Sequence, residues 1–335
     1  MTWLIVVLAL ALVAAACGED AETTTTAAAG ETTTTAAAAE PFRIAIVAPS
    51  ASNDLAFTQS IVDAVNVIKD EMGNVEVQVT DGTFVVDDAA AAIRAYADDG
   101  VDLVIAHGSQ YGGSLQEIAP DFPDTAFAWG TAADTFGLAN VFAYEAASDE
   151  GGYVMGVMAA ALSESGTIGI VGPVEVGDAK LYVDGFKAGV LAQDPAANVL
   201  VNYTDSFSDV ALASEAAQAQ AANGADVMSG TAQMVVGAVT VASDANILWF
   251  GTQANQTSLA PDIVVASQVY HWEVALRDII AKIEAGTLGG EIYKIDLANG
   301  GEVIEYNEAF AVPADVKQLG DDTIAGIIDG SITTR

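Results

Sequence analysis

Short apolar runs alternate along the first half of the chain with stretches whose apolar positions follow a helical period. The apolar runs predict buried strands at 43–48, 75–79, 101–106 and 126–129. Helical patterns lie between them at about 54–71, at 88–98 and near 114. This βαβαβ order predicts a parallel sheet with helices on both of its faces.

The same rhythm restarts in the second half of the chain. After a helix at 151–162, strands are predicted at 167–171, 199–203, 226–228 and 247–250, with helices at 180–193, at 210–223 and from about 234. Two such halves predict two similar α/β lobes, and we expect the chain to cross between them near 144–149 and 267–272. Ligands of open α/β sheets lie outside the carboxyl ends of the strands, so one cleft between the lobes should hold the ligand.

An apolar run from Leu4 ends at Cys17, the single cysteine among the 335 residues. Small residues before Cys17 and polar residues after it resemble a bacterial lipobox, in which the lipidated (palmitate-bearing) cysteine becomes the first residue of the mature protein. The resemblance implies an exported protein anchored to the outer face of the bacterial cell membrane. A retained membrane helix is the alternative, but the run of roughly 14 residues is shorter than the about 20 that span a bilayer. Residues 1–3 lack the Lys or Arg that usually begins a signal peptide.

Residues 18–40 consist mainly of Thr, Ala, Gly and Glu, with no large apolar side chain to bury. This composition predicts a flexible linker with a reach of roughly 25–30 Å. The following chain is long enough for two lobes, and no later segment is apolar enough to span a membrane.

The net charge is −36, from 46 acidic and 10 basic residues. Such a chain is repelled by phosphate backbones, which argues against nucleic acid as a partner. The acidic residues are scattered, which is typical of a solvated surface. A saline habitat and the ordinary acidity of an exported protein both explain it.

Sequence signals for catalysis are weak. His107 and His271 have no metal-ligand spacing around them, and no GxSxG, HExxH or GxxxxGK[ST] motif is present. The glycines of 166–172 run through a predicted strand instead of following one, which argues against a dinucleotide site. We therefore expect no enzyme activity, no cofactor and no metal.

Polar and aromatic residues follow the predicted strands, where the cleft should lie. In the segment after the first strand, Asn53 and Asp54 either contact the ligand or cap a helix, and Phe57 either contacts it or packs in the core. The other cleft candidates are Ser109, Gln110, Tyr111 and Trp129 in the first lobe, Thr231 and Gln233 in the second, and Tyr270 and Trp272 near a crossing. Lobe-interior packing is the alternative for Trp129, and hinge packing for Tyr270 and Trp272.

Four segments in order resemble the basic membrane protein family, the substrate-binding lipoproteins of ABC importers with a PnrA-like domain. They are DLAFTQS at 54–60, GFKAG at 185–189, YTDSFSD at 203–209 and GADV at 224–227. The resemblance covers about 42–335 and implies a two-lobed, periplasmic-binding-protein-like (type I) fold. Members of the family bind nucleosides, and one branch takes free purine bases.

The resemblance implies that Phe57 and Phe207 stack on the two faces of a base, with Asp54 and Asp205 as hydrogen-bonding partners. The chain departs from the family pattern at three positions, and the last two of them concern the recognition of ribose. Thr58 replaces an Asn, Gln253 ends a GTQ segment where nucleoside binders have G-x-D for the ribose, and the usual Lys after the next strand is missing. A site without those groups favours a flatter ligand such as a free nucleobase.

The predicted organisation is a signal peptide at 1–17, a linker at 18–40, lobe 1 at 41–146, lobe 2 at 147–268, a return to lobe 1 at 269–312 and a C-terminal helix at 313–335. The expected function is that of a monomeric, tethered receptor that closes on a purine-like molecule and passes it to an ABC permease. A surface sensor that signals to a membrane kinase, and a binder of sugars or other small solutes, remain open alternatives. An extracellular hydrolase lacks an evident nucleophile–base pair.

Overall fold

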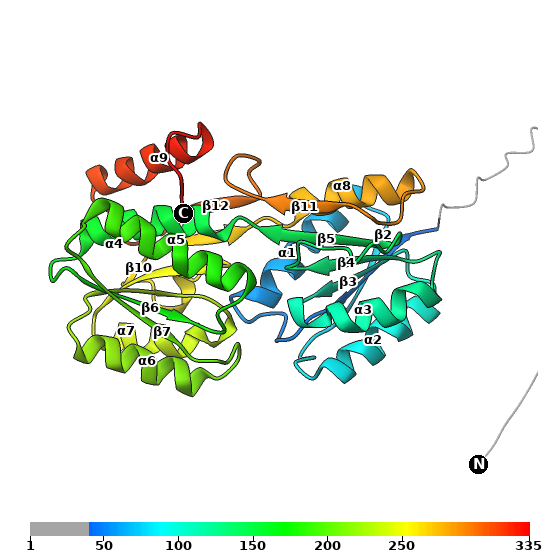
Figure 1. Cartoon of the computed structure of the whole chain (residues 1–335), viewed down its shortest axis with the longest axis horizontal. Helices are drawn as coiled ribbons and strands as arrows, with labels where there is room; N and C mark the ends of the chain where they lie inside the picture. Colours follow the sequence, from blue (N-terminus) through cyan, green and yellow to red (C-terminus); the bar gives the residue numbers. More distant parts are fainter. Residues whose placement is uncertain (1–39) are drawn as a thin grey trace, which may run out of the picture. The chain divides into compact units, whose positions relative to one another are not determined.

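The computed structural model describes residues 40–335 as one unit with two lobes (Figure 1). The first lobe is built on a parallel sheet with the spatial order β11 (Ile292–Ile295), β5 (Val141–Ala146), β4 (Ala126–Gly130), β3 (Leu103–His107), β1 (Phe42–Val47) and β2 (Val75–Thr80). The predicted signal peptide, Cys17 and most of the predicted linker lie outside the described residues.

The second lobe repeats this design. Its sheet has the order β12 (Glu302–Tyr306), β10 (Val264–Tyr270), β9 (Leu248–Gln253), β8 (Val227–Gly230), β6 (Thr167–Gly172) and β7 (Asn198–Tyr203). All its pairings are parallel except that of β12 with β10.

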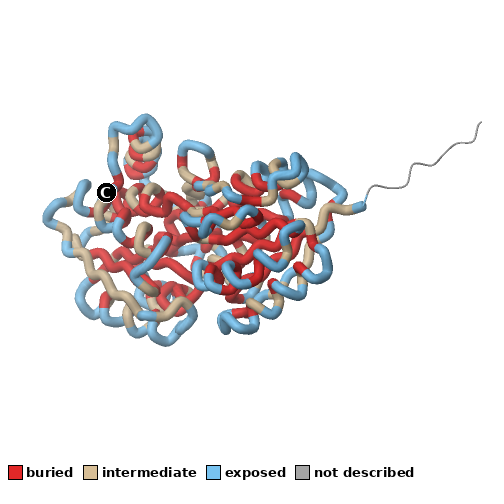
Figure 2. The backbone as a smooth tube through the Cα atoms, turned by 45° about the vertical axis from the view of Figure 1, so that its right-hand side comes forward, coloured by how far each residue is buried: buried red, intermediate tan, exposed pale blue. Residues whose placement is uncertain are grey.

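Helices cover both faces of each sheet because both faces of the strands are apolar. In β1, Ile44 and Ile46 point into the core beneath α1 (Phe57–Met72) and α8 (Glu273–Glu284), and the alternate positions point toward α2 (Val86–Asp98) and α3 (Gly112–Ile118). In the second lobe the corresponding helices are α4 (Ser148–Leu162) and α5 (Gly177–Gln193) on one face, and α6 (Val210–Ala222) and α7 (Val236–Asp244) on the other. In Figure 2 the buried stretches of the tube, in red, run mainly along the strands between the helices, and the exposed stretches, in pale blue, lie mainly on the outside.

Three connections join the lobes. The chain passes to the second sheet after β5 and returns to the first lobe between β10 and α8. It crosses a third time between β11 and β12, and α9 (Ala314–Ile328) then packs on α4. Among residues 40–335, none of the helices combines the length and apolar character needed to cross a bilayer.

The third connection corrects one predicted boundary. The sequence predicts that 269–312 belongs to the first lobe, but β12 pairs antiparallel with β10, and β10 itself ends at Tyr270 in the second sheet. These strands lie near the edges of the sheets. Their partners are far away in the sequence, so the local apolar pattern does not reveal which sheet they join.

Helices α4 and α5 pack at a distance that only glycine permits at several positions. A Cβ added at Gly152 or Gly156 would overlap backbone atoms of α5, and one added at Gly185 or Gly189 would overlap backbone atoms of α4. These glycines hold α4 and α5 close together on one face of the second sheet.

We expect Gly156→Ala to lower the free energy of unfolding by about 1–3 kcal/mol, because the new methyl group has no space beside the Phe186 carbonyl. Gly113→Ala is the matched control: Gly113 is exposed in α3 with nothing near its Cβ position, so alanine should stabilise the protein by about 0.5–1 kcal/mol. Urea unfolding measures both. Equal effects of the two substitutions would show that the helix contact does not depend on glycine.

Candidate ligand-binding site

A cavity lies between the two lobes at the carboxyl ends of the strands. Residues that follow β1, β2, β3 and β4 line it from the first lobe, and residues that follow β6, β7 and β8, together with the last residue of β9, line it from the second. Its unfilled space is about 490 Å³, part of which is open to solvent. The position agrees with the rule for ligands of open α/β sheets.

Six of the residues predicted from the sequence lie together in this cavity: Phe57, Ser109, Gln110, Phe207, Gln233 and Gln253. Phe57 is the first residue of α1, and its ring stacks on the His107 ring with 4.1 Å between centroids. Phe207 comes from the other lobe. The cavity therefore has one of the two predicted aromatic rings on each lobe, and the assignment of both to ligand binding stays a prediction.

Sequence reasoning missed several lining residues, among them Phe84, Thr131 and Asp178. Phe84 follows β2, Thr131 follows β4, and Asp178 is the second residue of α5, the helix after β6. Each comes after a strand, so the same positional signal could have identified all three.

Three of the predicted site residues lie at or just before the start of α1 and are not among the residues that line the cavity: Asn53, Asp54 and Thr58. Asp54 accepts hydrogen bonds from the backbone N–H groups of Ala56, Thr58 and Gln59 at 2.9–3.1 Å and from the Ser50 hydroxyl at 2.6 Å. Thr58 is buried, and its hydroxyl oxygen lies 2.7 Å from the hydroxyl oxygen of Ser50. The Asn53 side chain is exposed to solvent. For Asp54, the capping alternative accounts for the three bonds that its carboxylate accepts from backbone N–H groups.

Tyr111 and Trp129 pack inside the first lobe instead of lining the cavity. The Tyr111 hydroxyl donates to the Thr83 carbonyl at 2.9 Å, and the Trp129 indole N–H donates to the Gly108 carbonyl at 3.1 Å. Both side chains belong to the core beneath α2 and α3. An aromatic residue at a strand end can point into the core or the cleft, and the sequence does not distinguish the two directions.

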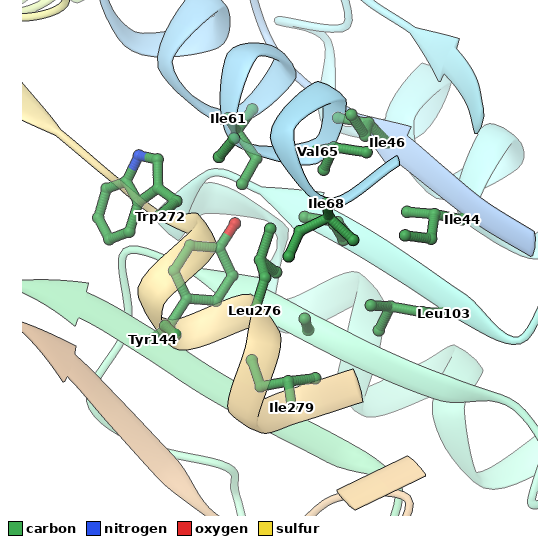
Figure 3. Close-up of a cluster of buried hydrophobic side chains, with 14 of the residues drawn as sticks. Ile44, Ile46, Ile61, Val65, Ile68, Leu103, Tyr144, Trp272, Leu276 and Ile279 are labelled. Carbon is green, nitrogen blue, oxygen red and sulfur yellow. The ribbon is translucent and has the colours of Figure 1, made fainter. Parts of the chain in front are cut away.

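Tyr270 and Trp272 belong to the core at the second connection. Figure 3 shows Trp272 beside Tyr144 in the cluster of apolar side chains beneath α1 and α8. The Trp272 indole N–H donates to the Ser60 hydroxyl at 2.9 Å, and the hydroxyls of Tyr270 and Ser148 are 2.7 Å apart. Both side chains are buried beside a connection between the lobes, which agrees with hinge packing, the alternative to ligand contact that the sequence left open.

Asp205 and Thr231 also lie outside the cavity lining. Asp205 is exposed at the tip of its loop with φ 55°, and the Thr231 side chain is buried behind the cavity wall. Phe207 lies in the same loop as Asp205 and does line the cavity. The YTDSFSD segment at 203–209 therefore contributes an aromatic side chain to the cavity and no carboxylate.

Two buried polar atoms in the cavity have no hydrogen-bond partner among the described residues: Asp178 Oδ2 and Gln253 Oε1. Asp178 is the one ionisable side chain among the described lining residues, and burial raises its pKa to about 8. Behind Phe57, burial lowers the pKa of His107 to about 3, so its ring is neutral. The cavity wall therefore carries little charge at pH 7, although the chain as a whole is strongly acidic.

Comparison with known proteins agrees with this architecture. Residues 42–331 match the family described as ABC transporter substrate-binding protein PnrA-like. The chain is 28% identical over 245 residues to a purine-binding protein of Brucella abortus, with 73% of this chain and 69% of that protein covered. It is 26% identical over 264 residues to the transcriptional activator protein med of Bacillus subtilis, covering 77% and 80%.

Among solved structures, an ABC transporter system solute-binding protein from Conexibacter woesei superposes with a TM-score of 0.72 at 24% identity, covering 87% of this chain and 97% of that one. This likeness confirms the predicted two-lobed, periplasmic-binding-protein-like α/β fold.

We expect Asp54→Ala to lower the free energy of unfolding by about 0.5–2 kcal/mol, because three N–H groups at the start of α1 lose their acceptor. The neighbouring variant Asn53→Ala removes an exposed side chain and should change stability by less than about 0.5 kcal/mol. Thermal and urea unfolding compare the two. Equal stability of both variants would contradict the capping role.

Proposed function

The chain belongs to the family of PnrA-like ABC transporter substrate-binding proteins, and we propose that its ligand is a purine-like molecule, a free nucleobase in preference to a nucleoside. The observation that carries this proposal is the pairing of Phe57 and Phe207, one aromatic ring from each lobe, in one cavity with little charge. A planar base can stack on aromatic rings of this kind, and such stacking is worth about 0.5–1.5 kcal/mol beyond the area it buries.

The ring of Phe57 is held by its surroundings. It stacks on His107, whose Nδ1 lies 2.7 Å from the Tyr144 hydroxyl, and His107 is fully buried. A ring backed in this way loses little further freedom when a base stacks on its open face, which favours binding.

The preference for a base over a nucleoside rests on Gln253 and on the absence of a cation. Gln253 is neutral, and none of the described lining residues is Lys or Arg. A site built with buried partners for the ribose hydroxyls discriminates strongly for a nucleoside, and this chain has Gln253 where nucleoside binders of the family have an Asp. The printed name of the Brucella relative, a purine-binding protein, is consistent with a purine ligand.

Ligand contacts from both lobes would favour the closed arrangement of the protein. The lobes already touch beside the cavity, where the Gln256 side-chain amide donates to the Leu55 carbonyl at 3.3 Å. Closure around the base would then present a defined surface to an ABC permease.

We further propose that a lipid on Cys17 tethers the protein to the outer face of the cell membrane, with 18–40 as the linker. These residues other than Glu40 lie outside the described part of the chain, and the support is the lipobox resemblance. The tether would keep the receptor near the permease that takes its ligand.

A sensor is the second candidate function, because one relative is named a transcriptional activator. Uptake of a labelled base by cells that lack this gene separates the two functions. Loss of uptake supports the importer, whereas normal uptake with a lost transcriptional response to the base supports the sensor.

Titration calorimetry with adenine, guanine, xanthine, their nucleosides and ribose should give the tightest binding for a base. We expect Phe207→Ala to weaken that binding at least about tenfold, which corresponds to about 1.4 kcal/mol, with little change in melting temperature. Phe310→Ala is the matched control, because Phe310 is a half-buried phenylalanine of the same lobe that packs on its core away from the cavity.

Tight binding of ribose or of nucleosides without affinity for any base would contradict the proposed ligand. Turnover of a nucleoside by the purified protein would contradict a pure binding function. If Phe207→Ala mainly lowers the melting temperature, Phe207 has a packing role and the stacking assignment is wrong.

We expect Cys17→Ser to move the protein from the membrane fraction to the soluble fraction of a bacterial culture, because the acylated thiol is lost. The control is a chain that starts at residue 40, which should bind the same base with unchanged affinity. Mass spectrometry that finds Met1 and an unmodified Cys17 in the wild-type protein would rule out the anchor.

A further inference from the structure

We propose that Asp178 presents a protonated carboxyl group to the cavity and donates a hydrogen bond to an acceptor atom of a neutral ligand. This inference rests on the proposed function, and it adds the hydrogen-bonding pattern that the base must carry. Asp178 would then be a residue that determines specificity, at a position that the family motifs in this sequence do not include.

The geometry around Asp178 is that of a polar group prepared for an external partner. The side chain lines the cavity, is 9% exposed, and its Oδ2 has no hydrogen-bond partner among the described residues. A buried carboxylate left unpaired is costly, so such groups are paired or become neutral. Within the described structure no cation forms an ion pair with Asp178, which leaves neutralisation by a proton.

Charged and titratable groups surround Asp178 from several elements. Burial, and after it the negative charge of Glu145 on β5, raises the pKa of Asp178 from 3.8 to about 8. Lys294 on β11 and the N–H of Ala146 act in the opposite direction and are outweighed. Tyr144, Tyr270 and Glu302 also face Asp178, and a negative charge there would raise their pKa values further.

The position of Asp178 in the first turn of α5 does not reverse this balance. The amino end of a helix stabilises a negative charge by up to about 2 kcal/mol in a buried site, which is about 1.5 pKa units. The rise from 3.8 to about 8 is larger. Asp178 is therefore mostly protonated at pH 7.

A neutral carboxyl donates through its O–H, whereas the unpartnered Gln253 Oε1 can only accept. The two atoms together call for a ligand with at least one acceptor and one N–H donor on its edge. Neutral purine bases carry both. A cationic ligand would instead require the ionised form of Asp178, and the pH dependence of binding distinguishes these cases.

The test is the affinity of the tightest-binding base measured from pH 6 to pH 9 for the wild type, Asp178→Asn and Asp178→Ala. The protonated share of Asp178 falls from about nine-tenths at pH 7 to about one-tenth at pH 9, so wild-type affinity should fall about tenfold relative to Asp178→Asn. Asparagine keeps a donor of the same shape without titrating. The ratio of the two proteins cancels ionisation of the base itself.

We expect Asp178→Asn to bind at pH 7 within about threefold of the wild type and Asp178→Ala to bind at least about tenfold more weakly at every pH. Asp205→Asn is the control, because Asp205 is an exposed aspartate outside the cavity. Calorimetry in two buffers of different ionisation enthalpy should show proton uptake on binding near pH 8 in the wild type. The Asp205→Asn variant should take up the same number of protons as the wild type.

Several results would overturn the inference while leaving the proposed function intact. These are identical pH profiles for wild type and Asp178→Asn, proton release instead of uptake, and full affinity in Asp178→Ala with an unchanged melting temperature. Failure of the wild type to bind any base at any pH would reject the proposed function itself and this inference with it.

Discussion

The requirement that both faces of each parallel sheet be covered determines the rest of this structure. Strands such as β1 are apolar on both sides, so helices must lie on both faces, and every connection has to return across the sheet. That arrangement directs the carboxyl ends of the parallel strands of a lobe to one edge of its sheet. With two such lobes joined by three connections, the loops at these edges enclose the cavity that holds Phe57, Phe207 and Asp178.

The sequence predicted the two lobes and the position of the cavity, because both follow from local periodicity and the strand-end rule. It did less well on the direction of individual side chains. Trp272 and Tyr111 follow strands as Phe57 does, yet hydrogen bonds to Ser60 and Thr83 hold them in cores. Such contacts join residues that are distant in the sequence, and so does the pairing of β12 with β10. No local pattern contains this information.

The low charge of the cavity contrasts with the surface. Burial keeps His107 neutral and raises the pKa of Asp178 to about 8, while most of the other acidic residues are exposed to solvent. Desolvation thus converts a side chain that the composition counts as negative into a potential hydrogen-bond donor. The net charge of the chain describes its surface and says little about its ligand, so the signal that the sequence offered for Asp178 was its position after β6 and not its charge.

A crystal structure of the protein with its tightest-binding base tests the account most directly, because it shows at once whether both lobes contact one ligand. The account predicts the base between the rings of Phe57 and Phe207, with one of its acceptor atoms within hydrogen-bond distance of Asp178 Oδ2. A base bound outside this cavity, or held by one lobe alone, would contradict it.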